Sequence, residues 1–219
     1  MLPFTREQFL SVFVAYNDAV WPAPVLAYLL GLGMVVALVR RQAPSDRILG
    51  AGLAAMWIWT GIAYHWLFFS RINRGAVVFG ALFVLQGALL VHAALAHGAL
   101  VFGTTRRATS WLGWALLAYA SLGYPVVGLW TGHRYPAAPM FGITPCPVTL
   151  FTLGLFLLTT RPVPGRLLVI PLAWSLVGGS AAFLLHVLQD WPLLVSGLIV
   201  PILLLREPHP SVRVDGGSP

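Results

Sequence analysis

The chain has 219 residues, of which 58% are hydrophobic and only 9% are charged, and its mean hydropathy is +0.84. Soluble domains carry about 25% charged residues, so this composition excludes a water-soluble globular protein. The net charge of +7 comes from thirteen arginines without any lysine. These arginines lie in short gaps between apolar runs, which is typical of membrane loops rather than of a nucleic-acid surface. The absence of lysine excludes a photoreceptor with a retinal Schiff base.

The first predicted element is a short amphipathic helix from Thr5 to Asp18. Thr5 and Gln8 have the spacing of a capping box. One face of this helix carries four apolar or aromatic residues, Phe9, Val12, Phe13 and Tyr16. Such a helix could lie among the lipid headgroups or cover the mouth of a helical bundle. Residues 1–20 are therefore interpreted as an N-terminal interfacial helix.

Residues 21–206 are predicted to form an all-α polytopic membrane bundle of about seven transmembrane helices. The predicted spans are Pro22–Val39, Ile48–Phe69, Ala76–Gly98, Ser110–Trp130, Pro147–Thr160, Leu167–Val187 and Pro192–Leu205. The fifth and seventh are short for a bilayer core of about 30 Å. The polar tail, residues 207–219, is predicted to be disordered and cytoplasmic.

The distribution of arginines predicts the orientation in the membrane. One side would hold nine, namely Arg40, Arg41, Arg47, Arg106, Arg107, Arg161, Arg166, Arg206 and Arg213. The other side would hold four, namely Arg6, Arg71, Arg74 and Arg134. Because positive charge concentrates in cytoplasmic loops, we expect the N-terminus outside and the C-terminus inside a bacterial inner membrane.

Two stripes of small residues end in a histidine near the predicted outer side. The stripes are Gly50, Ala54, Gly61 and His65 on the second span, and Gly178, Ala182, His186 and Asp190 on the sixth. Small residues let helices approach closely, so both stripes should face protein, and we expect His65 and His186 to share one cavity. At a spacing of four residues, Asp190 could orient His186 as a metal ligand or proton acceptor. Alternatively, the two histidines only hydrogen-bond neighbouring helices and hold the bundle together.

The loop before the fifth span, GHRYPAAPMFGITPCP, is stiffened by prolines, and Gly132 and Gly142 permit tight turns. Cys146 would lie in the first helical turn, where a thiol ionises more readily and could act as a soft metal ligand or nucleophile. It could equally be a small packed residue. The segment from His133 to Tyr135 could close over an outer cavity or anchor the chain at the headgroups.

The candidate ligand-binding residues are therefore Tyr64, His65, His133, Arg134, Tyr135, Cys146, His186 and Asp190. Among them His65, His186 and Asp190 could hold a divalent metal, which is the only cofactor that the sequence suggests. No catalytic motif and no nucleic-acid-binding motif is present.

Several strings resemble a known family: MLPFTREQFL, YNDAVWP, AYHWLFFSRIN and GHRYPAAPMFGITPCPVTLFTLG. The family contains small bacterial multi-pass membrane proteins and is catalogued only as a domain of unknown function, with some members labelled permeases. The resemblance implies the fold and the membrane location, and it assigns no role to any residue.

The leading functional hypothesis is a small-solute or ion transporter, or a binding protein, with a polar site in the outer half of the bundle. Its partners would be the lipid bilayer and the solute. One alternative is a membrane-embedded enzyme, since the chain resembles seven-helix ceramidase-type metal-dependent hydrolases in helix count, outward N-terminus and scattered His and Asp. It lacks their histidine pair in the last span. A third alternative is a structural accessory subunit.

Overall fold

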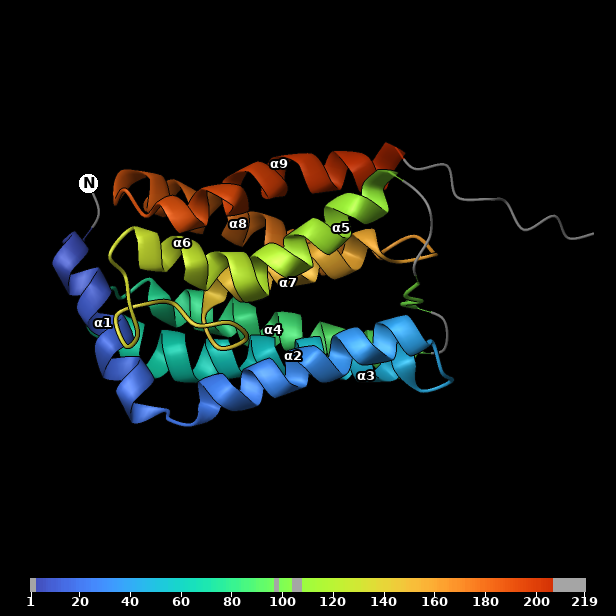
Figure 1. The fold of residues 1–219 in the computed structure, drawn as a ribbon, viewed down its shortest axis with the longest axis horizontal. Helices are drawn as coiled ribbons and strands as arrows, with labels where there is room; N and C mark the ends of the chain where they lie inside the picture. The colour runs from blue at the N-terminus through green and yellow to red at the C-terminus, as the bar shows by residue number, and fades with distance from the viewer. Residues whose placement is uncertain (1–2, 97–98, 104–107, 207–219) are drawn as a thin grey trace, which may run out of the picture.

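The computed structural model describes residues 3–96, 99–103 and 108–206, and the regular elements in these ranges are helices packed lengthwise into a bundle (Figure 1). Six helical segments are long and apolar enough to cross a membrane. They are Ala23–Arg40, Ser45–Arg71, Ala76–Leu95, Thr109–Trp130, Arg166–Leu184 and Leu188–Arg206. The predicted all-α polytopic membrane bundle is confirmed. The predicted disordered tail lies outside the described residues.

Several of these segments are built from more than one kind of helix. In chain order the elements after the first helix are α2 (Ala23–Arg40), α3 (Ser45–Trp59), η1 (Thr60–Phe68), η2 (Phe69–Arg71), α4 (Ala76–Leu95), α5 (Ala108–Ala118), η3 (Tyr119–Gly123), α6 (Tyr124–Trp130), α7 (Pro145–Leu157), α8 (Arg166–Leu184), η4 (Leu188–Asp190) and α9 (Trp191–Arg206). Both η1 and η3 are π-helices, whereas η2 and η4 are single 3₁₀ turns.

The N-terminal helix α1 (Arg6–Ala19) lies across one end of the bundle, which is called the α1 end below (Figure 1). It begins at the predicted capping box, in which Thr5 and Gln8 each accept a hydrogen bond from the other's backbone N–H. The Tyr16 hydroxyl donates to the carbonyl of Ile143 at 2.8 Å. The Asn17 amide donates to the carbonyls of two further loop residues, Pro136 and Ala138. Helix α1 therefore covers this end of the bundle, as one of the two predicted locations requires.

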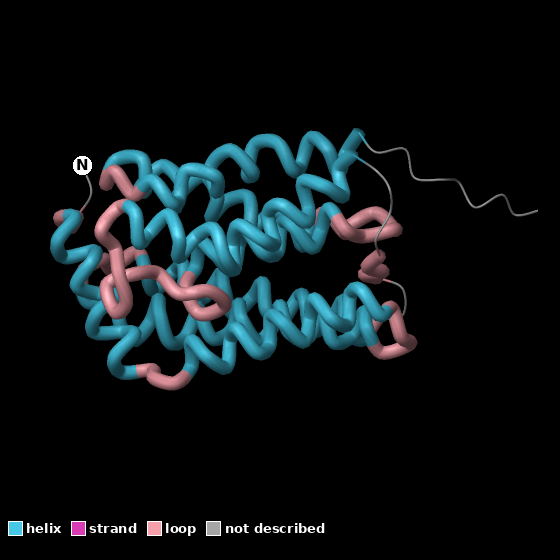
Figure 2. The backbone as a smooth tube through the Cα atoms, viewed as in Figure 1, coloured by secondary structure: helices cyan, strands magenta, loops and turns pink. Residues whose placement is uncertain are grey.

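Helix α7 is the central helix, and all of its 13 residues are buried. At about 1.5 Å per residue it is roughly 20 Å long, so it is shorter than the predicted fifth span suggested and too short to cross a bilayer alone. The loop of residues 131–144 folds back towards the middle of the bundle before α7 begins (Figure 2). The predicted seventh span, by contrast, was too short, since the helical segment Leu188–Arg206 has 19 residues.

Helices in the middle of the bundle approach each other at glycines. A Cβ added to Gly154 of α7 would lie 2.9 Å from the carbonyl oxygen of Gly113 in α5, and the reverse distance is the same. The small-residue stripe on α3 and η1 packs against α4 in the same way, with Gly50 against Ala94 and Gly61 against Gly80. The prediction that this stripe faces protein is confirmed.

Two prolines leave backbone carbonyls that neighbouring helices satisfy. Pro171 in α8 has no N–H for the carbonyl of Leu167 four residues earlier, and the Gln86 side chain of α4 donates to that carbonyl at 2.9 Å. Pro125 likewise frees the carbonyl of Ser121, which accepts the hydroxyl of Tyr28 at 3.0 Å. Such compensation is needed in a bilayer because no water is available to replace the lost bond.

Candidate functional site

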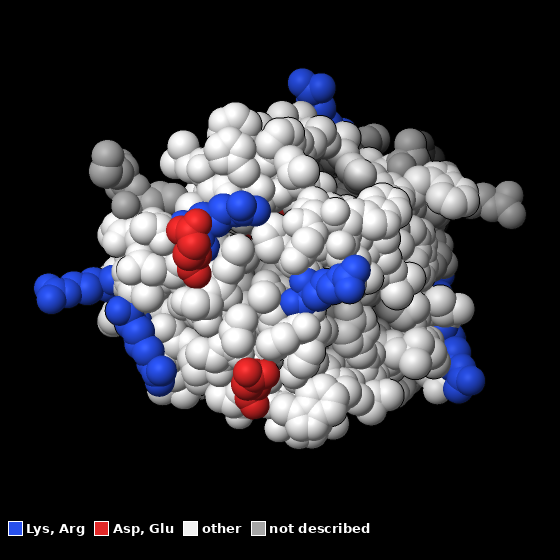
Figure 3. All heavy atoms as spheres, turned by 60° about the vertical axis from the view of Figure 1, so that its left-hand side comes forward, with Lys and Arg blue, Asp and Glu red and all other residues white. Residues whose placement is uncertain are grey.

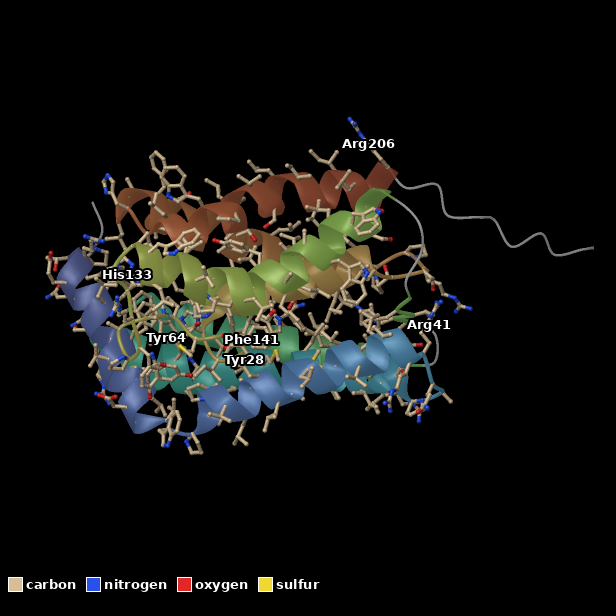
Figure 4. The ribbon with its side chains drawn as sticks, viewed as in Figure 1. Tyr28, Arg41, Tyr64, His133, Phe141 and Arg206 are labelled. Carbon is tan, nitrogen blue, oxygen red and sulfur yellow. The ribbon has the colours of Figure 1, made fainter. Side chains whose placement is uncertain are left out.

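A cavity of about 550 Å³ lies beneath α1, between α1, η1, the start of α4, the first turn of α7 and the second half of α8. Figure 4 shows one of its lining residues, Tyr64, in the half of the bundle nearest α1. The cavity lies next to the buried N-terminus of α7. It exists because α7 begins inside the bundle and leaves the α1 end without a central helix.

Aromatic rings form most of the cavity wall. Seven of them line it, namely Phe4, Phe9, Phe13, Tyr64, Phe69, Phe79 and Trp174. The rings also support one another: the centroids of Phe13 and Tyr64 are 5.6 Å apart, and those of Phe79 and Trp174 are 5.3 Å apart. Because each ring is packed on one side by another ring, the wall is rigid as well as apolar.

Two polar residues of the lining, Cys146 and Asp190, contact each other, and Tyr124 contacts Asp190 from outside the lining. Asp190, which is only 2% exposed, lines the cavity and accepts a hydrogen bond from the Tyr124 hydroxyl at Oδ1. The thiol of Cys146 lies against the same carboxylate. Asp190 also directly precedes α9, where the helix dipole favours a negative charge. The group Asp190, Tyr124 and Cys146 is called the polar floor below.

The cavity opens through the side of the bundle. Three of its lining residues on α8 are largely exposed, Leu176 at 46%, Val177 at 47% and Leu184 at 62%. From the first to the last of these residues the helix rises about 12 Å. Figure 3, which brings the α1 end forward, shows several Arg, Asp and Glu side chains separated by wide uncharged surface. Because Leu176, Val177 and Leu184 are apolar and lie in the candidate span Arg166–Leu184, this side of the cavity would face lipid chains in a membrane.

Both π-helices lie close to this site. Tyr64 lies on η1, and η3 ends directly before Tyr124 of the polar floor. A π-turn widens a helix by one residue and shifts the side chains that follow it, and such turns are frequent at functional sites. The two π-helices therefore set the directions in which these two tyrosines point.

The predicted site residues divide into two groups. Tyr64, Cys146 and Asp190 line the cavity together, whereas the other five do not. His65 is completely buried beside the cavity, with its ring centroid 5.1 Å from that of Trp174 and 4.7 Å from that of Phe83. Neither nitrogen of the His65 ring has a hydrogen-bond partner among the described residues. This residue therefore lies behind the cavity wall.

The predicted helical pair of His186 and Asp190 is wrong, because α8 ends at Leu184. His186 is the left-handed residue that terminates the helix, with a φ of 55°, and its side chain is exposed. The hydrogen bonds of a Schellman motif surround it, from the N–H of Val187 to the carbonyl of Ala182 and from its own N–H to that of Phe183. The predicted common cavity of His65 and His186 is consequently not present.

The loop residues His133 and Tyr135 contact α1, Arg134 is exposed, and none of the three lines the cavity. The Arg6 guanidinium lies 3.3 Å from Nε2 of His133, and the Thr131 hydroxyl lies 3.0 Å from its Nδ1. Since arginine only donates, Nε2 must accept and the ring is neutral. Burial, reinforced by the charge of Arg6, lowers the pKa of His133. Tyr135 donates to the backbone carbonyl of Asn17 in α1 at 3.4 Å.

The three candidate metal ligands, His65, His186 and Asp190, are not brought together. Within residues 3–96, 99–103 and 108–206 there is no group of three or more His, Cys, Asp or Glu side chains that could hold a metal ion. The described residues therefore do not supply a set of ligands for the predicted divalent metal.

Sequence reasoning missed Tyr124, Trp174 and several of the wall phenylalanines. The amphipathic pattern of the N-terminal helix places Phe9 and Phe13 on its apolar face. This pattern was the one feature of the sequence that could have identified part of the cavity wall. The position of Tyr124 directly before Pro125 gave no indication of its role, because its partner Asp190 is 66 residues away in the sequence.

Together the fold and the site define a polytopic helical membrane protein with a side-opening, ligand-sized cavity. Residues 6–212 match a family of unknown function, DUF6064, so the chain belongs to this family, as its sequence motifs suggested. Neither the comparison with curated proteins nor that with solved structures gave a match.

Proposed function

We propose that this protein binds a small, mainly apolar molecule in the cavity beneath α1, as a membrane binding protein or as the solute-binding unit of a transporter. The observation that carries the proposal is a cavity of about 550 Å³ with aromatic walls, a polar floor and an opening on the side of the bundle. Small-molecule sites are typically clefts of about 300–1,000 Å³, mostly apolar with a few convergent polar groups. The side opening supports entry from the lipid phase.

We further propose that the α1 end faces the outside of a bacterial inner membrane. The predicted excess of arginines on the opposite side supports this orientation. Two of those arginines, Arg41 and Arg206, lie at the end of the bundle opposite α1 (Figure 4). The ligand would then enter from the outer leaflet.

The single cysteine of the chain gives a direct test, because Cys146 lines the cavity. The full chain in phosphatidylcholine nanodiscs would be treated with N-ethylmaleimide, and the rate of Cys146 alkylation measured by mass spectrometry. We expect 1-adamantanol, a compact apolar probe, to slow this reaction saturably by about tenfold, since an occupied pocket excludes most of the reagent. Alkylation that is unaffected by 1-adamantanol would contradict the proposal.

Two variants on the same helix provide matched controls. Ala181→Phe places a ring in the cavity and should slow alkylation without any probe, whereas Ala173→Phe lies on the exposed face of α8 away from the cavity and should not. A cysteine on the exposed surface of α2, in the Leu29→Cys variant with Cys146→Ser, controls for effects of the probe on the membrane. Its alkylation should not respond to 1-adamantanol.

A further inference from the structure

We infer that the molecule bound in this cavity carries one organic ammonium group, which lies against the Asp190 carboxylate and the aromatic wall. This inference rests on the proposed function, because it names the chemical class of the ligand for the same cavity.

The first argument is the charge of the cavity. Among the described residues that line it, Asp190 is the only charged side chain, and no arginine or histidine faces the carboxylate from within. Tyr124 and Cys146 provide a hydroxyl and a thiol, which solvate the carboxylate without neutralising it. Burying a carboxylate is costly unless an opposite charge accompanies it. A cationic ligand would supply the charge that the protein leaves out.

The second argument is the composition of the wall. Seven aromatic rings line the same cavity as Asp190. The faces of such rings attract cations, and cages of aromatic side chains are the common protein site for ammonium groups. A neutral ligand would be equally well served by leucine and valine walls, so seven rings in a cavity with a single charged group, a carboxylate, favour a cation.

The third argument separates an organic cation from a metal ion. Hard metal ions need about six oxygen or similar ligands, whereas Asp190 is the only carboxylate in the described lining, and the described residues contain no group of three or more His, Cys, Asp or Glu side chains that could hold a metal ion. The rings cannot replace the remaining water ligands. An ammonium group needs only a carboxylate and ring faces, and its apolar body would fill the part of the cavity that opens beside Val177 and Leu184.

The test compares three probes of nearly the same shape in neutral phosphatidylcholine nanodiscs at neutral pH: 1-adamantanamine, 1-adamantanol and 1-adamantanecarboxylate. Each is assayed by its protection of Cys146 from N-ethylmaleimide, with its concentration expressed per membrane lipid. We expect the amine to protect at concentrations about tenfold lower than the alcohol, and the carboxylate not to protect. Equal protection by amine and alcohol, or stronger protection by the carboxylate, would overturn the inference.

The Asp190→Asn variant should lose the preference for the amine and keep protection by the alcohol. The control Asp18→Asn removes an exposed carboxylate from α1, at the same end of the bundle, and should keep the preference. If Asp190→Asn does not fold, the comparison of the three probes on the unaltered chain alone decides whether the ligand is an ammonium compound. Loss of protection by all three probes contradicts the proposed function, whereas protection without selectivity contradicts only the ammonium inference.

Discussion

The middle of the bundle and its α1 end use buried polar groups in opposite ways. In the middle, Gln86 is paired with a carbonyl that Pro171 leaves free, and the helices touch at glycines. At the α1 end, Asp190 faces a cavity of about 550 Å³ that has no basic side chain in its described lining. Both side chains are buried in a membrane bundle. The difference is that Gln86 completes the packing between two helices, whereas Asp190 is left beside open space.

The largest expected effect tests the tight packing of the middle. Gly154→Leu would place a side chain against the carbonyl of Gly113, so we expect it to lower the free energy of unfolding by about 3 kcal/mol or more. Ala181→Leu adds three carbon atoms, nearly as many as Gly154→Leu, but adds them into the open cavity, so it should cost less than about 1 kcal/mol. Unfolding by SDS titration in mixed micelles would measure both. Similar losses for the two variants would remove the distinction between the regions.

A second prediction concerns the pairing of Gln86 with the proline kink. Gln86→Met should lower the free energy of unfolding by about 1 kcal/mol, because the carbonyl of Leu167 loses its partner. In a Pro171→Ala background the new N–H of residue 171 can donate to that carbonyl, so Gln86→Met should then cost almost nothing. The double-mutant cycle measures this coupling. A cost that is the same in both backgrounds would show that Gln86 acts in another way.

A smaller effect is expected from pH at the contact between α1 and the loop. The pKa of His133 is lowered from its ordinary 6.5 by burial and by Arg6, so folding favours the neutral ring. Its contribution to stability is therefore present above pH 6.5 and is lost as the pH falls below that value towards the lowered pKa. Hydrogen exchange of the α1 amides, corrected for intrinsic rates, should accelerate on acidification. His133→Gln should weaken this dependence, and an unchanged dependence would contradict the assignment.

The smallest effect is expected at His65. Both of its ring nitrogens are buried without a partner among the described residues, so an apolar replacement leaves no group newly unpaired. We expect His65→Met to stay within about 0.5 kcal/mol of the original stability and to keep protection of Cys146 by 1-adamantanol. A loss of protection without a loss of stability would show instead that His65 contacts the ligand.

The sequence predicted the bundle better than the site, for physical reasons that particular residues show. Long apolar runs must become helices in lipid, and the stripe through Gly50 and Gly61 could only face a neighbouring helix. The end of α8 was not predictable in this way, because His186 occupies the left-handed position where glycine is the usual signal. The helical spacing of His186 and Asp190 therefore led to a pair that does not exist.

Part of the cavity was nevertheless predicted. Tyr64, Cys146 and Asp190 were selected as polar residues near one end of the spans, and they do line one cavity. What the sequence could not indicate was the depth at which α7 begins, since its apolar residues are compatible with a full span. That depth creates the space beneath α1 and brings Tyr124 to Asp190 across 66 residues of sequence.

The most direct test of the central claim is photolabelling of the folded protein in nanodiscs with adamantane diazirine, followed by mapping of the labelled residues by mass spectrometry. If the cavity binds a small apolar molecule, its lining residues Phe4, Phe9 and Phe13 at the N-terminal end and the wall around Phe69 will be labelled, and 1-adamantanol will compete with this labelling. The exposed face of α2, which includes Leu26 and Leu29, will be labelled without competition. Labelling confined to such lipid-facing surfaces, with none in the cavity, would contradict the account.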